Sequence, residues 1–93
     1  MREAGTLLVE FLENQKVKRV YCVPGESYLS VMNGLQETSI DTILCKHEGA
    51  AAIMAEADGK LTGRPGIAFV TRGPGATNAA AGVHIAQQDS TPM

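Results

Sequence analysis

Three short apolar segments alternate with helix-forming segments along the chain, and this alternation limits the fold more than any other feature. The apolar segments cover residues 17–23, 41–46 and 67–71. Each ends near Gly, Pro or charged residues that favour a turn. Because apolar strands joined by helical crossovers are typical of parallel sheets, the pattern predicts an α/β fold. We expect a parallel sheet of at least three strands with helices on both faces.

Four helices are expected around this sheet. The first covers residues 2–15, and its spacing predicts an apolar face made of Leu7, Leu8, Phe11 and Leu12. The second follows the turn after residue 23, with Ser27 as its N-cap. Ala-rich segments 50–61 and 76–88 predict the other two, since Ala has the highest helix propensity. Residues 73–75 are predicted to form a turn before the last helix.

Charge and composition exclude several classes of function. The 93 residues carry eight Lys and Arg against ten Asp and Glu, a net charge of −2, so no basic excess is present to neutralise nucleic-acid phosphates. No apolar run approaches the ~20 residues of a membrane helix, and Glu3 falls where a signal peptide is basic. Two cysteines do not form a disulfide framework. We therefore expect neither nucleic acid nor membrane as a partner, and a cytoplasmic location.

Candidate site residues follow the three predicted strands. Ligands of open parallel sheets bind outside the carboxyl ends of the strands, which here are residues 24–26, 47–49 and 72–78. Glu48 is the sharpest candidate and has two interpretations. It is either a first-turn acid that complements the helix dipole, or a partly desolvated carboxyl group whose raised pKa suits proton exchange with a ligand nitrogen.

The neighbouring candidates also have structural alternatives. His47 lacks partners at metal-ligand spacing, so a structural hydrogen bond is favoured and no metal ligand is assigned. Residues 73–75 read Gly-Pro-Gly, half of a dinucleotide fingerprint, but Asn78 replaces its last glycine. This segment is either a tight turn or a place where backbone amides approach a ligand. Glu26 is either a solvated turn residue or faces the cleft.

Five motifs occur in an order that resembles one known family. They are VYCVPG at 20–25, HEGAA at 47–51, ADGKLTGRPG at 57–66, GPGATN at 73–78 and DSTPM at 89–93. Together they resemble the N-terminal pyrimidine-binding domain of thiamine-diphosphate enzymes of the acetolactate synthase type. The resemblance covers essentially the whole chain. It implies that residues 1–93 form the N-terminal part of such a domain.

The resemblance also implies a chemistry for the candidate residues. In the family, the glutamate matching Glu48 hydrogen-bonds the N1′ atom of the aminopyrimidine and favours its imino tautomer. The nitrogen of that tautomer then removes the thiazolium C2 proton. Glu48 would then be catalytic in an enzyme that decarboxylates or ligates 2-oxo acids. The cofactor would be lined by Pro24, Gly25, Glu48, Gly73, Pro74, Gly75 and Asn78. The family's site forms between two subunits, so a homo-oligomer is expected.

Two departures from the family pattern bear on these expectations. Acetolactate synthases usually read Pro-Gly-Gly-Ala after the first strand, whereas this chain has Glu26 and Ser27 at the last two positions. These two residues are predicted on the substrate side. The family's diphosphate domain, which holds Mg²⁺, has no counterpart here, and FAD binding by the parent enzyme stays open. We therefore expect a fragment that is inactive alone.

Two other functions stay open on this sequence. The chain could be a non-catalytic α/β module that pairs with a separate subunit. It could also be a nucleotide-binding, Rossmann-like piece that uses residues 73–78, although the acidic ribose ligand expected ~20 residues later would lie outside the chain.

Overall fold

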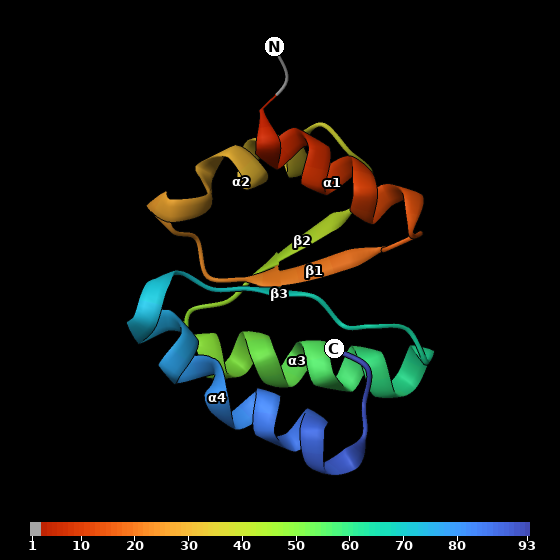
Figure 1. Cartoon of the computed structure of the whole chain (residues 1–93), viewed down its shortest axis with the longest axis vertical. Coiled ribbons are helices and arrows are strands. Elements are labelled where there is room, and N and C mark those ends of the chain that lie inside the picture. The colour runs from red at the N-terminus through yellow and green to blue at the C-terminus, as the bar shows by residue number, and fades with distance from the viewer. Residues whose placement is uncertain (1–2) are drawn as a thin grey trace.

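A three-stranded parallel sheet lies between helical layers in the computed structural model, which describes residues 3–93 (Figure 1). The central strand is β1 (Arg19–Cys22), with β2 (Asp41–Leu44) on one side and β3 (Ala68–Phe69) on the other. Tyr21 is the register partner of both Ile43 and Ala68. The α/β fold with a parallel sheet is thus confirmed. The predicted helix start at residue 2 lies outside the described residues.

The helices cover both faces of the sheet, as predicted (Figure 1). On one face lie α1 (Ala4–Asn14) and α2 (Leu29–Gln36), the latter preceded by a short 3₁₀ helix, η1 (Glu26–Tyr28). The other face is covered by α3 (Glu48–Thr62). The last helix, α4 (Arg72–Asp89), packs on the outer side of α3. The sheet therefore has one helical layer on one side and two on the other.

Side chains of β1 alternate between the two faces of the sheet, and each face has its own hydrophobic core. Val20 is fully buried on the α1 and α2 side, in a cluster with Val9, Leu12, Leu35 and Ile40. Tyr21 points to the other face and packs against Ala51 and Ala55 of α3. Because successive strand residues face opposite sides, this one strand supplies both cores. The α3 side is filled mainly by alanine, which brings the helix close to the sheet.

The apolar face predicted for α1 is wrong in part. Leu12 is buried, but Leu7, Leu8 and Phe11 are 51%, 40% and 58% exposed. The buried residues of α1 are instead Gly5, Val9 and Leu12. A Cβ at position 5 would lie 2.3 Å from the backbone carbonyl carbon of Ser30, so the missing side chain lets α2 approach. Close contact at this glycine sets which face of α1 turns inward.

Both Ala-rich helices begin earlier than predicted. α3 starts at Glu48, and the Nδ1 atom of His47 accepts a hydrogen bond of 2.9 Å from the Gly49 N–H. The structural role predicted for His47 is thus confirmed. α4 starts at Arg72, so residues 73–75 form its first turn and not a separate loop. Proline is tolerated there because the first N–H groups of a helix have no intrahelical partner.

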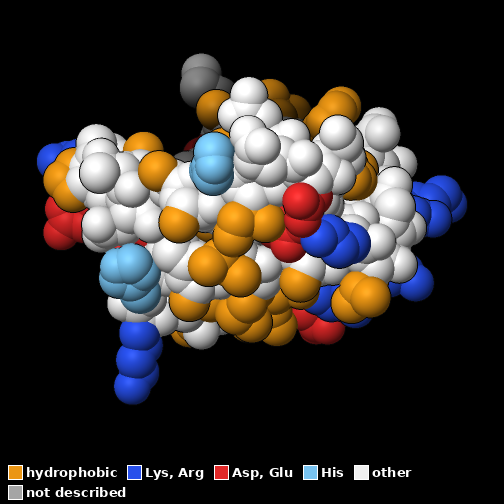
Figure 2. Space-filling view, turned by 90° about the horizontal axis from the view of Figure 1, so that it is seen from below, with side chains coloured by type: hydrophobic (Ala, Val, Ile, Leu, Met, Phe, Trp, Pro, Cys, Tyr) orange, Lys and Arg blue, Asp and Glu red, His pale blue; other side chains and the backbone are white. Residues whose placement is uncertain are grey.

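Hydrophobic side chains gather on the outer face formed by α3 and α4 (Figure 2). Ile53, Met54, Leu61 and Val83 are 44%, 41%, 87% and 53% exposed. These larger residues point outward because alanine and glycine occupy the contact between the helices and the sheet. No described helix is long and apolar enough to cross a membrane.

Candidate functional site

Glu48, the first residue of α3, lies beside the first two turns of α4 at the carboxyl end of the sheet. Its Oε1 atom accepts a hydrogen bond of 3.1 Å from the side-chain amide of Asn78. A Cβ at Gly75 would lie 3.6 Å from the other carboxylate oxygen, Oε2. The structure therefore brings together three predicted residues from two separate motifs. The carboxylate is held on one side by an amide and faces a glycine on the other.

The electrostatics of Glu48 differ from the expectation of a desolvated carboxyl group. Its side chain is only partly buried. Its own backbone N–H at the start of α3, followed by the Asn78 amide, lowers the pKa of Glu48 below the ordinary 4.5. Hydrogen bonds to the charged form favour that form, so Glu48 is an ionised carboxylate at neutral pH in the free chain. The raised pKa predicted from the sequence is wrong for this state.

Replacing Asn78, which supplies this amide, should raise the pKa of Glu48. In Asn78→Ala, the pKa of Glu48 is expected to rise toward 4.5, because the carboxylate loses the hydrogen bond from the Asn78 amide that helps to keep it ionised. A carboxylate with a lowered pKa stabilises the fold above the unfolded pKa, and this contribution is lost as the pH falls through the folded pKa. The stability difference between wild type and variant should therefore be present at neutral pH and vanish in acid.

Side-chain ¹³C NMR titration of Glu48 measures this shift directly. The exposed neighbour Thr77 provides a matched control, because Thr77→Ala changes α4 without touching the carboxylate. An unchanged Glu48 pKa in Asn78→Ala would contradict the role given to the amide.

The loop after β1 is tied to the end of β3 by close packing and hydroxyl contacts. A Cβ at Gly25 would lie 2.8 Å from the Cβ of Thr71, so only glycine lets the loop approach this closely. The hydroxyl groups of Ser27 and Thr71 hydrogen-bond each other. Ser27 is therefore not the N-cap of α2; Tyr28 holds that position without a side-chain cap bond.

Tyr28 also holds the loop after β1 in place, through its hydroxyl group and its ring. Its hydroxyl donates to the backbone carbonyls of Val23 and Phe69, the latter at 3.4 Å. Its ring stacks on Phe69 with centroids 5.8 Å apart. Burial raises the pKa of Tyr28 to about 12, so it remains a neutral donor. Tyr28 and Thr71 were not predicted as site residues from the sequence, although Thr71 stands at the end of a predicted strand, where ligand sites of parallel sheets form.

Other predicted residues lie on the segments that follow β1 and β3. Pro24, Glu26, Gly73 and Pro74 are all exposed. Nothing lies within 4 Å of a Cβ placed at Gly73, so open space borders the start of α4. Residues 3–93 contain no group of three or more His, Cys, Asp or Glu side chains that could hold a metal ion. Within the described residues, the site thus consists of one oriented carboxylate, one amide and open glycine backbone.

Comparisons with known proteins place these residues in a family context. Residues 2–93 match the family model described as "Thiamine pyrophosphate enzyme, N-terminal TPP binding domain". The acetolactate synthase of Bacillus subtilis is 41% identical over 87 residues, which are 94% of this chain and 15% of that enzyme. A probable 2-ketoarginine decarboxylase of Pseudomonas aeruginosa is 39% identical, over 97% of this chain and 16% of that protein. The large subunit of acetolactate synthase isozyme 3 of Escherichia coli is 39% identical, over 100% of this chain and 16% of that subunit.

Proposed function

Because this chain belongs to the family of thiamine pyrophosphate enzymes, through their N-terminal TPP binding domain, we propose that it supplies the aminopyrimidine half of a cofactor site. The parent activity would be that of an acetolactate synthase-like enzyme that decarboxylates or ligates 2-oxo acids. One observation carries the proposal: the Glu48 carboxylate is fixed by Asn78 at 3.1 Å and stands beside the glycine backbone of α4.

The residues at this position fit a flat heterocycle bearing ring nitrogens. Gly75 presents no side chain to Glu48, and open space lies beside Gly73. A ring can therefore approach the carboxylate from the glycine side. Backbone N–H groups at the start of α4 add a positive dipole end that tolerates a nearby anion. Pro24 and Gly25 would border the ring from the loop after β1.

The residues of this chain would act through proton exchange and orientation. Glu48 would hold or return a proton at a pyrimidine ring nitrogen, and ligand binding would displace the water that now solvates it, raising its pKa. Asn78 would keep the carboxylate aimed at that nitrogen. The bound cofactor supplies the electron sink for breaking or forming a bond at the carbonyl carbon of a 2-oxo acid.

The remaining parts of the site would come from outside this chain. The chain spans about a sixth of the length of its relatives. We propose that a further domain holds the diphosphate and Mg²⁺, and any FAD, and that a second subunit docks on the exposed apolar face of α3 and α4. Both cysteines are free thiols, which supports a reducing compartment such as the cytoplasm.

The substrate side is assigned to the loop after β1. Glu26 and Ser27 replace the family's Gly-Ala pair, and both side chains are exposed at the carboxyl end of the sheet. We propose that they contribute to the choice of 2-oxo acid. Glu26→Gly in the assembled enzyme should change the ratio of kcat/KM values between two 2-oxo acids, and an unchanged ratio would remove Glu26 from this role.

Calorimetric titration separates this function from its alternatives. The chain is expected to bind thiamine diphosphate in preference to NAD⁺, with weaker binding in Glu48→Gln, because the ring nitrogen then loses its carboxylate partner. Preference for NAD⁺ would favour a Rossmann-like nucleotide module. Absence of binding to either compound would favour a non-catalytic module that pairs with a separate subunit. The isolated chain with thiamine diphosphate, Mg²⁺ and pyruvate should release no carbon dioxide, and measurable turnover would overturn the half-site proposal.

A further inference from the structure

A cavity of about 630 Å³ lies at the end of the sheet opposite to Glu48. It is bounded by the end of α1, the loop into β1, the end of α3 and the loop into β3. These are the points where β1 and β3 begin, whereas the candidate site lies where the strands end. The cavity is therefore separate from the proposed cofactor half-site. Its volume falls within the range of roughly 300–1,000 Å³ that is usual for small-molecule pockets.

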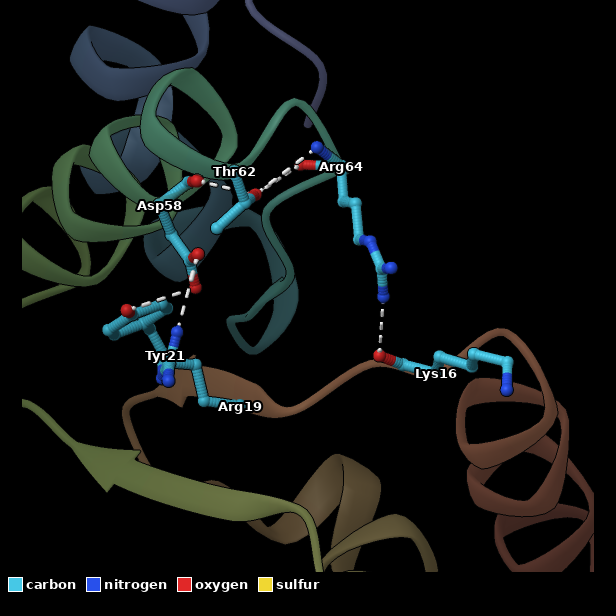
Figure 3. Close-up of polar contacts among 6 residues, drawn as sticks. All are labelled: Lys16, Arg19, Tyr21, Asp58, Thr62 and Arg64. Carbon is cyan, nitrogen blue, oxygen red and sulfur yellow. Dashed lines mark hydrogen bonds and ion pairs between the residues drawn. The ribbon is translucent and has the colours of Figure 1, made fainter.

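The lining of this cavity is strongly cationic in an acidic chain. Four of the chain's eight basic residues line it, against one of its ten acids. The four are Lys16, Lys18, Arg19 and Arg64. The single acid is Asp58, whose carboxylate already pairs with Arg19 at 3.6 Å and accepts a hydrogen bond of 3.1 Å from the Tyr21 hydroxyl (Figure 3). The excess positive charge is therefore available to a ligand.

Hydrogen bonds hold part of this cationic rim in place. Arg64 extends from the loop after α3 toward the loop after α1, where it donates to the Lys16 carbonyl at 3.3 Å (Figure 3). The Thr62 hydroxyl donates to the Asp58 carbonyl at 2.8 Å and accepts from the Arg64 N–H at 3.1 Å. Within residues 3–93, the ammonium groups of Lys16 and Lys18 have no hydrogen-bond or ion-pair partner. The guanidinium groups of Arg19 and Arg64 are thus held in place, whereas the ammonium groups of Lys16 and Lys18 are free to reach a ligand.

Apart from Gln15 and Thr62, apolar side chains form the rest of the lining. They are Phe11, Leu12, Val17, Pro65 and Ile67. Phe11 is 58% exposed, so an aromatic ring stands open at the cavity. Arginine and lysine bind phosphate oxygens well, and arginine does so with two parallel bonds. An aromatic ring beside such cations suits a planar apolar body. We propose that this cavity binds an organic phosphate that carries an aromatic body.

Fluorescence titration of the whole chain with 1-naphthyl phosphate tests this proposal. Lys18→Glu is expected to raise its Kd by about tenfold or more, the cost of losing a charge-assisted contact. Phe11→Ala should raise the Kd by roughly two- to tenfold through lost ring stacking. Inorganic phosphate and 1-naphthol, which carry only one half of the ligand each, should both bind more weakly than 1-naphthyl phosphate.

Matched variants outside the cavity serve as controls. Lys46 and Leu61 are exposed and do not line it, so Lys46→Glu and Leu61→Ala should leave the Kd unchanged. Circular dichroism checks that all four variants keep their helices. Equal weakening by Lys18→Glu and Lys46→Glu would reveal non-specific charge attraction and overturn the proposal, as would a Kd unaffected by Lys18→Glu and Phe11→Ala. Glu48→Gln should not alter this Kd, which keeps the result independent of the cofactor half-site.

Discussion

Glu48→Gln is expected to lower the turnover of the assembled enzyme about 10²- to 10⁴-fold, the usual contribution of a positioned acid–base group. Glutamine keeps the shape of the side chain, and its carbonyl oxygen can still accept the hydrogen bond that Asn78 donates to Oε1. It cannot exchange a proton at a ring nitrogen. Because the side chain is partly exposed and glutamine keeps its shape, the stability of the fold should change little.

The assembled enzyme can be built as a chimera. Residues 1–93 would replace the matching segment of the Bacillus subtilis acetolactate synthase, which is 41% identical over 87 residues. Turnover of pyruvate is then compared among the chimera, its Glu48→Gln variant and Glu13→Gln. Glu13 is exposed near the end of α1, so its variant controls for the loss of one surface charge. Near-normal turnover in Glu48→Gln would remove Glu48 from its proposed role.

The two cores of the fold could be predicted because they follow from local periodicity. Val20 and Tyr21 are adjacent residues of one strand and must face opposite sides, so helices on both faces follow. The buried face of α1 could not be found this way, because it depends on how closely α2 approaches at Gly5. Leu7 and Phe11 have the spacing of a core face and are nevertheless exposed. A hydrophobic pattern does not predict the contacts of a glycine such as Gly5, because glycine has no side chain to contribute to the pattern.

The candidate site was predictable as a set of segments but not as a set of contacts. Parallel strands place their carboxyl ends together, which is why Glu48 and Asn78 were expected near one another. The hydrogen bond between them depends on α4 beginning at Arg72, whereas the Gly-Pro-Gly segment predicts a turn. Arg72 adopts a left-handed φ of 56°, and this one backbone conformation turns the chain into the helix. The pKa direction of Glu48 in turn depends on the hydrogen bonds it accepts from its own backbone N–H and from the Asn78 amide, and the sequence does not specify these contacts.

Gly82→Val is expected to destabilise the fold by about 1–3 kcal/mol or more, the usual cost of overpacking a close contact. A Cβ at Gly82 would lie 2.5 Å from the Cβ of Ala52 and 2.7 Å from its carbonyl carbon. The backbone atoms of α3 cannot rotate away, so α4 must shift or detach. Gly73→Ala is the matched control, because nothing lies within 4 Å of its added methyl group. Urea unfolding of the chain measures both variants.

This variant also tests whether the packing of α4 supports the site. Gly82 and Asn78 lie on the same helix, one turn apart, so displacing α4 at Gly82 should also withdraw the amide from Glu48. The Glu48 pKa in Gly82→Val should then rise toward its ordinary value, as in Asn78→Ala, although no residue touching the carboxylate has changed. A rise together with lower stability would show that close α3–α4 packing positions the carboxylate. Unchanged stability would mean that α4 does not dock through Gly82. Lower stability with an unchanged Glu48 pKa would mean that the first turns of α3 and α4 hold the site independently of the packing below them.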